Sequence, residues 1–100
     1  MSHKFHTIKV NYNPKLLEQE AIFRIYNHRC IMCGHFASEI NEIDGRARNK
    51  DNIKNRKNRV PLCPPCHREF HHNGVTPEKI KDMKERRVEF LLMLGKESEI

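Results

Sequence analysis

The sequence predicts a small α+β domain organised around four cysteines. One hundred residues are enough for one domain, and 37% hydrophobic residues without tryptophan predict a thin core that gains from a metal staple. All four cysteines fall into two C-x-x-C pairs, and the segment between the pairs alternates polar and apolar residues as a strand does. We therefore expect a single domain over residues 1–100, with its core at residues 30–72 and helices on both sides.

The segment before the first cysteine predicts a strand or arm and then a helix, together covering residues 4–28. Residues 4–10 alternate polar and apolar side chains. Asn13 followed by Pro14 suits the N-cap and first position of a helix that runs to about residue 28. The apolar residues expected to face the core from this helix are Leu17, Ala21, Ile22 and Ile25.

Between the cysteine pairs the pattern predicts a β-hairpin that encloses a basic loop. Residues 38–44 alternate with period two, and residues 59–62 return as the second arm, where Pro61 is typical of an edge strand. Residues 45–59 carry seven basic side chains against one aspartate, so this stretch holds the whole net charge of +6. A solvated loop is one reading, but such clustering is more typical of contact with a phosphate backbone and predicts DNA as the partner. The basic residues are Arg46, Arg48, Lys50, Lys54, Arg56, Lys57 and Arg59.

Two helices are expected after the second cysteine pair. A short one runs from His67 to about His72 and ends at Asn73-Gly74. A longer one covers residues 77–94, with an N-cap and proline at its start and Gly95 as its stop. Its expected inward residues are Ile80, Met83, Leu91 and Leu94.

The C-terminal helix carries more apolar surface than one core face needs. Residues 91–94 form a continuous apolar run. Core packing is the simpler reading, and a homodimer through this helix is the alternative. Residues 96–100 are expected to be a frayed tail.

No apolar run approaches the ~18 residues of a membrane span, and the first ten residues do not resemble a signal peptide, so we expect a soluble cytoplasmic protein with no membrane partner.

The cysteines predict a structural zinc site. In a reducing compartment, paired C-x-x-C motifs are typical of zinc rather than disulfides. Four thiolates close the coordination shell, so this zinc is expected to hold the fold. The ligands are Cys30, Cys33, Cys63 and Cys66.

Two histidines directly follow the last cysteine pair. His67 and His71 stand at i and i+4, which places both imidazoles on one helical face as a metal claw. The alternative is two unrelated surface histidines in a chain that has seven. A zincin would need glutamate directly after the first histidine, whereas Glu69 is at i+2. A nucleotide deaminase would need its histidine before the cysteine pair, so that motif does not fit either.

The order of these pieces resembles the HNH endonuclease family in its zinc-stapled, four-cysteine form. The matching pieces are a strand ending at Asp44, Asn58 five residues before the second cysteine pair, and His67 directly after the last cysteine. The resemblance covers about residues 30–72, under half of the chain. It implies a ββα-metal (His-Me finger) fold with flanking N- and C-terminal helices.

The resemblance also implies an activity and a set of roles. Asp44 and His67 would bind one catalytic divalent ion such as Mg²⁺ or Mn²⁺, with His71 as a further ligand, and Asn58 would brace the loop that carries the general base. The implied reaction is hydrolysis of DNA phosphodiester bonds, by an enzyme of the sort encoded by phages and mobile elements. Its location would then be the cytoplasm of the host cell.

The chain departs from the family at the general-base position. The residue after Asp44 would be histidine, and here it is Gly45, which cannot accept a proton. His35 and His72 are candidate substitutes by their proximity in sequence, and a short gap in the turn would shift the match. The alternative function is therefore a degenerate HNH-fold module that binds nucleic acid or a protein partner without cleavage.

Overall fold

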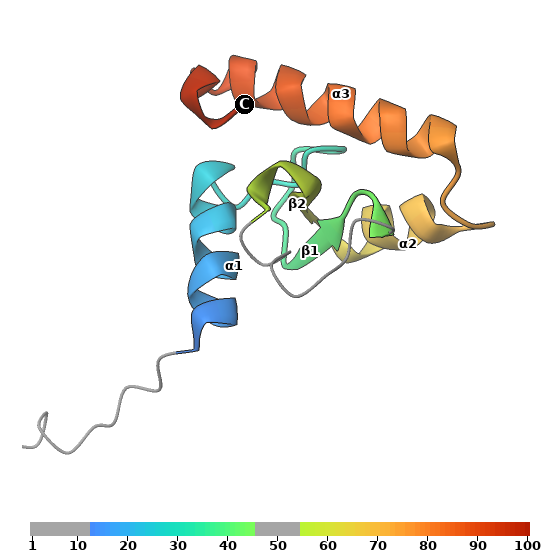
Figure 1. The fold of residues 1–100 in the computed structure, drawn as a ribbon, viewed down its shortest axis with the longest axis horizontal. Coiled ribbons are helices and arrows are strands. Elements are labelled where there is room, and N and C mark those ends of the chain that lie inside the picture. Colours follow the sequence, from blue (N-terminus) through green and yellow to red (C-terminus); the bar gives the residue numbers. More distant parts are fainter. Residues whose placement is uncertain (1–12, 46–54) are drawn as a thin grey trace, which may run out of the picture.

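The computed structural model describes residues 13–45 and 55–100. In these ranges the chain forms three α-helices and a two-stranded antiparallel sheet, which confirms the predicted α+β class (Figure 1). No helix in the same ranges is long and apolar enough to cross a membrane. The strand or arm expected at residues 4–10 lies outside the described residues. The elements are α1 (Pro14–Ile25), β1 (Glu39–Glu42), β2 (Arg59–Leu62), α2 (Pro64–His71) and α3 (Pro77–Met93), with short 3₁₀ turns η4 (Arg56–Asn58) and η5 (Glu97–Glu99).

Helix α1 begins where the sequence predicts and ends earlier. The side chain of Asn13 accepts a hydrogen bond from the backbone N–H of Lys15 at 2.9 Å, as an N-cap does. The helix stops before residue 28 because Asn27 and His28 adopt left-handed φ angles of 55° and 58°. The expectation that Leu17 faces the core is wrong, since this residue is 53% exposed. The first turn of α1 extends past the hairpin (Figure 1), and its side chains are exposed in the described part of the chain.

The predicted hairpin is confirmed, with arms of four residues each. Glu39 lies opposite Leu62 and Glu42 lies opposite Arg59. Pro61 is tolerated because both strands of a two-stranded sheet are edges. Its carbonyl accepts a hydrogen bond from the N–H of Ile31 at 3.3 Å, which attaches the first cysteine pair to β2.

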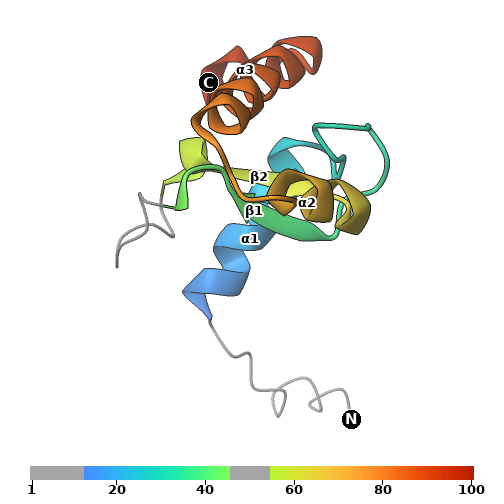
Figure 2. The ribbon, with the colours of Figure 1, turned by 90° about the vertical axis from the view of Figure 1, so that its right-hand side faces the viewer.

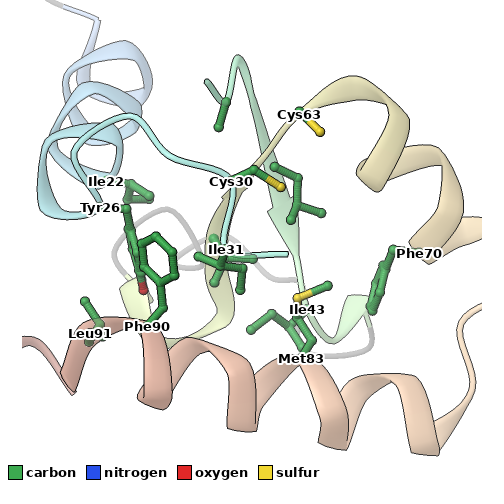
Figure 3. Packing of buried hydrophobic residues seen from close by; sticks show 13 residues of the cluster. Ile22, Tyr26, Cys30, Ile31, Ile43, Cys63, Phe70, Met83, Phe90 and Leu91 are labelled. Carbon is green, nitrogen blue, oxygen red and sulfur yellow. The ribbon is translucent and has the colours of Figure 1, made fainter. Parts of the chain in front are cut away.

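Helix α3 covers the core from one side. Met83, Phe90 and Leu91 project from α3 toward the residues of α1 and the hairpin (Figure 3). The Tyr26 and Phe90 rings lie 6.2 Å apart between centroids. The predicted inward positions on α3 are confirmed, because Met83 and Leu91 are buried while Ile80 and Leu94 pack against the same cluster.

The C-terminal residues are folded, so the expectation of a frayed tail is wrong. Arg87 is 5% exposed and must find acceptors for its buried guanidinium. Its Nη2 donates to the carbonyl of Glu99 at 2.6 Å in η5, which holds the last turn against α3. Lys96 donates from Nζ to the carbonyl of Ile25 at 2.5 Å, so the same segment caps the end of α1.

A lysine of α3 fixes the end of α2. The last turn of a helix leaves carbonyls without intrahelical partners. Lys79 donates from Nζ to the carbonyls of Phe70 (3.0 Å), His72 (2.6 Å) and Gly74 (3.0 Å). Figure 2 shows α2 beside the hairpin and α3 apart from it, so this one ammonium group ties two elements that differ in direction.

Replacing Lys79 by methionine should lower the free energy of unfolding by about 1–3 kcal/mol, because three carbonyls lose a charged donor while the aliphatic stem stays. Chemical denaturation of the metal-loaded protein measures this. Lys81→Met is the control, since Lys81 is an exposed lysine of the same helix. Equal losses in the two variants would mean that the cap contributes nothing beyond surface charge.

Candidate metal centre and the adjoining cleft

The four cysteines of the sequence meet in one cluster. Their sulfur atoms all lie within 4.8 Å of one another, and Sγ of Cys33 is 3.6 Å from Sγ of Cys63. Tetrahedral zinc with Zn–S bonds of about 2.3 Å sets its sulfurs about 3.8 Å apart. The predicted gathering of the four cysteines is confirmed, and their spacing and chemistry suit a metal ion such as zinc.

The two C-x-x-C pairs are oriented by different backbone conformations. The first pair sits on a tight turn, where the N–H of Gly34 donates to the carbonyl of Cys30 at 2.8 Å and Gly34 adopts φ of 81°. The second pair opens α2, since Cys63 occupies the N-cap and its carbonyl accepts from the N–H of His67 at 2.9 Å. A turn and a helix start therefore face each other across the cluster.

The thiols of the cluster differ in acidity. Burial opposes ionisation of Cys30, but backbone N–H groups of Cys63, Cys33 and Met32 stabilise its thiolate and lower its pKa to about 7. Burial raises the pKa of Cys66, and hydrogen bonding to Cys63 raises it further. The metal-free cluster therefore holds protons that a bound metal must displace.

Beside the cluster lies a cleft of about 740 Å³ between β1, α2 and the start of α3. It brings together three of the four predicted catalytic residues with one predicted nucleic-acid contact and the glycine at the base position. Asn58 is not among the described residues that line it, and neither are His35 and His72, the candidate substitute bases. The lining residues from the predicted site are Asp44, Gly45, Arg59, His67 and His71.

Strand β1 supplies a partner for each histidine of α2. Nδ1 of His67 lies 2.8 Å from Oε1 of Glu39, and Nε2 of His71 lies 3.1 Å from Oδ1 of Asn41. The two pairs form because the spacings agree: residues i and i+4 lie about 6 Å apart along a helix, and residues i and i+2 lie about 6.6 Å apart along a strand. Glu39 and Asn41 are site residues that sequence reasoning missed. Their signal was the period-two alternation, which puts them on one face of the strand.

These contacts set which nitrogen of each ring can bind a metal. A carboxylate only accepts, so Nδ1 of His67 donates to Glu39, and Nε2 is the nitrogen that can offer a lone pair to a metal. Asn41 likewise accepts from Nε2 of His71, which leaves Nδ1 as the lone-pair nitrogen. Burial, then the nearby His67 and Lys79, hold the pKa of His71 below its usual value and favour the neutral ring. With ring centroids 5.0 Å apart, the two histidines suit neighbouring ligands of one divalent ion.

Asn58 fixes the backbone at Asp44. Its Oδ1 accepts from the N–H of Asp44 at 2.9 Å, and its Nδ2 donates to the carbonyl of Asp44 at 3.1 Å. The N–H of Ile43 adds a third bond to the carbonyl of Asn58 at 2.7 Å. A buried amide side chain thus holds both polar groups of one residue, which makes the end of β1 rigid where it borders the cleft.

Asp44 lines the cleft but does not form one compact ligand group with the two histidines. Among the described residues, the four cysteines form the group of three or more ligands whose donor atoms lie mutually close. The groups in contact with the histidines are Glu39 and Asn41 instead. Asp44 lines the same cleft just beyond the end of β1.

The described basic residues have three different settings. Arg56 forms an ion pair with Glu18 of α1, with Nη2 of Arg56 3.1 Å from Oε1 of Glu18. This contact lowers the pKa of Glu18. Arg59 is 6% exposed and lines the cleft, while Lys57 is exposed. Arg46, Arg48, Lys50 and Lys54 lie outside the described residues.

No protein-family model, curated protein or solved structure matches this chain. The function is therefore argued from the residues of the cleft and of the cysteine cluster.

Cys33→Ser should abolish stoichiometric metal binding and remove the cooperative thermal transition, because structural zinc contributes on the order of 10 kcal/mol to folding. Metal content by mass spectrometry and a thermal scan measure the two effects. Met32→Leu, which conserves volume inside the same turn, should keep both. A fully cooperative Cys33→Ser protein without metal would contradict a structural role for the cluster.

Glu39→Gln should weaken binding of a second divalent ion at the histidines about 10- to 100-fold, since a carboxylate partner orients a ligating imidazole and raises its basicity. Calorimetric titration of the zinc-loaded protein with Mn²⁺ or Ni²⁺ provides the measurement. Glu69→Gln on the exposed side of α2 is the matched control and should bind as the wild type does. Unchanged affinity in Glu39→Gln would remove Glu39 from the site.

Proposed function

We propose that the chain is a metal-dependent endonuclease of the HNH type that hydrolyses DNA phosphodiester bonds. The observation that carries the proposal is the composition of one cleft. Two histidines oriented by a strand, an aspartate with a braced backbone and a buried arginine all border it. In the proposed enzyme these residues would supply metal ligands and a phosphate-binding cation at the same opening.

In this proposal the cysteine cluster stabilises the fold and takes no part in the reaction. Four thiolates fill the tetrahedral shell of zinc and leave no position for water, so zinc there does no chemistry. Its contribution is to hold the turn of residues 30–34 against the junction of β2 and α2. Because His67 follows Cys66 directly, the cluster also positions the first residue of the histidine pair.

His67 and His71 are the proposed protein ligands of the catalytic divalent ion, with Asp44 as the carboxylate of the same cleft. Two imidazoles favour Mn²⁺, Ni²⁺ or Zn²⁺ over Mg²⁺, which prefers oxygen ligands. A divalent ion bound there would neutralise the scissile phosphate and stabilise the leaving oxygen. Other residues of the protein position these ligands. Glu39 and Asn41 fix the orientation of the two imidazoles, and Asn58 holds the backbone of Asp44.

Arg59 supplies the proposed contact to the phosphate. Arg59 lines the cleft and is almost fully buried, so the field of its charge is less screened than that of a surface arginine. A planar guanidinium suits two phosphate oxygens at once. The remaining basic residues of the 45–59 stretch give that side of the chain its positive charge, which supports DNA as the partner.

Gly45 supports a second candidate function, a degenerate HNH-fold module that binds nucleic acid or a protein partner without cleavage. The position beside Asp44 that would carry the proton acceptor has no side chain. A Cβ built at Gly45 meets no atom within 4 Å, and Gly45 is not among the glycines with positive φ. The backbone at this position therefore accepts a Cβ, so Gly45→His is a suitable variant for separating the two functions by experiment.

Supercoiled plasmid incubated with the zinc-loaded protein and Mn²⁺, Ni²⁺ or Mg²⁺ should be nicked, and His67→Ala should abolish nicking. Gly45→His should raise the rate by about 100- to 10,000-fold, because a positioned general base contributes that much. His35→Ala is the control, since His35 does not line the cleft.

The outcomes separate the two functions. Metal-dependent nicking by the wild type that His67→Ala abolishes supports the endonuclease. If the wild type is inert and Gly45→His cuts, the natural protein is a binding module with a site complete except for its base. If neither protein cuts with any of the metals, the endonuclease proposal is wrong.

A further inference from the structure

Three aromatic rings form a parallel stack that runs from the cleft to the surface. Phe23 of α1 and His28 of the following turn lie 5.2 Å apart between centroids with planes 5° from parallel. His28 and Phe36 lie 5.8 Å apart with planes 2° from parallel. Phe23 lines the cleft at the inner end, while Phe36 at the outer end is 69% exposed. One flat aromatic ring is therefore presented to solvent at the end of an ordered stack.

The backbone around the stack is fixed at several points. The N–H of His28 donates to the carbonyl of Phe23 at 2.7 Å, and the N–H of Ala37 donates to the carbonyl of His28 at 2.8 Å. His28 holds a left-handed φ of 58°, a conformation that costs free energy for a residue other than glycine. Phe36 follows the first cysteine turn, whose closing bond joins the N–H of Cys30 to the carbonyl of His35 at 2.7 Å. The backbone that carries the exposed ring is thus joined to the turn of the cysteine cluster, which limits the orientations that the ring can adopt.

A single exposed phenylalanine is common on protein surfaces and needs no function. Two features distinguish Phe36 from Leu16, Leu17, Leu92 and Met93, the other strongly exposed apolar residues among those described. Its ring continues a parallel stack, so its outer face is the next stacking position. It also pairs with Arg29 in an isolated antiparallel bridge, and Arg29 is exposed. In such a pair the Cβ atoms are about 5 Å apart, so a cationic side chain leaves the backbone beside the ring.

We propose that the outer face of Phe36 is a stacking site for an unpaired nucleobase, with Arg29 contacting a phosphate next to that base. A flat ring beside a cation is the arrangement by which proteins bind single-stranded nucleic acid, because every base has a π face and every nucleotide a charge. This inference rests on the proposed function for the kind of polymer, and it adds a substrate class: DNA with an unpaired segment beside the cleavage position. A fully paired duplex keeps its bases inside and offers none to Phe36.

The test measures binding of a labelled single-stranded oligonucleotide to the zinc-loaded 100-residue protein by fluorescence anisotropy. The second divalent ion is left out, so that no cleavage occurs. Phe36→Ala should weaken binding about 5- to 150-fold, the range for loss of one base–aromatic stack. Phe36→Trp should bind at least as tightly as the wild type, and Phe36→Leu should be as weak as Phe36→Ala because leucine is apolar but not flat. Leu17→Ala, another exposed apolar residue, should change nothing.

Two further readouts separate stacking from charge and from folding. An abasic oligonucleotide should bind the wild type as weakly as the normal strand binds Phe36→Ala, a comparison that needs no variant. Arg29→Ala should lower the slope of log affinity against log salt by about 1, while Phe36→Ala leaves that slope unchanged. Equal affinity of the wild type for normal and abasic strands, or wild-type affinity in Phe36→Leu, would overturn the stacking site.

Failure of this inference differs from failure of the proposed function. Nicking by the wild type together with Phe36-independent binding overturns the stacking site alone. Phe36-dependent binding without nicking by either the wild type or Gly45→His overturns the endonuclease alone. No binding of any DNA overturns both.

Discussion

The convergence of four sulfur atoms is the contact on which the other elements depend. The described core contains few large buried side chains, and the hairpin has only four residues in each arm. A two-stranded sheet is marginal by itself and needs a partner to be stable. The cysteine cluster joins the turn after α1 to the end of β2 and the start of α2, so one bound ion would replace contacts that a larger core would supply. Figure 3 shows Cys30 and Cys63 at the edge of this core, where their sulfurs add to its packing.

The same cluster makes the cleft rigid through helix α2. Cys66 and His67 are consecutive residues of a short helix, so a change at the sulfurs would move the imidazole that follows. The other end of α2 is held by Lys79, and its inner face by the contacts of His67 and His71 with β1. The helix is therefore fixed at its start, along its face and at its end. This explains how a helix of eight residues, too short to be stable alone, keeps two histidines in register.

Sequence reasoning could predict the parts that local chemistry determines. Asn13, Thr76 and Pro77 mark helix starts because caps act over three or four residues, and the C-x-x-C pairs predict a cluster because their ligand chemistry is specific. Long-range packing could not be predicted in this way. Leu17 has an apolar side chain on a suitable face, but α1 extends past the body that would cover it. The fold of the last residues depends on Arg87, whose burial no local pattern shows.

The candidate site was predictable in its histidines but not in their partners. A resemblance in spacing points to Asp44, His67 and His71 because it compares positions along the chain. Which oxygen meets which nitrogen depends on the register of β1 against α2, and the register places Glu39 and Asn41 opposite the two rings. Asn41 is almost fully buried, although its side chain is polar, because it lies between the core and the cleft and binds His71. Its Oδ1 meets His71, but its Nδ2 is buried without a hydrogen-bond partner among the described residues, so the amide is only half satisfied and costs free energy at this position. The strand therefore keeps the contact that orients His71 at the expense of better packing.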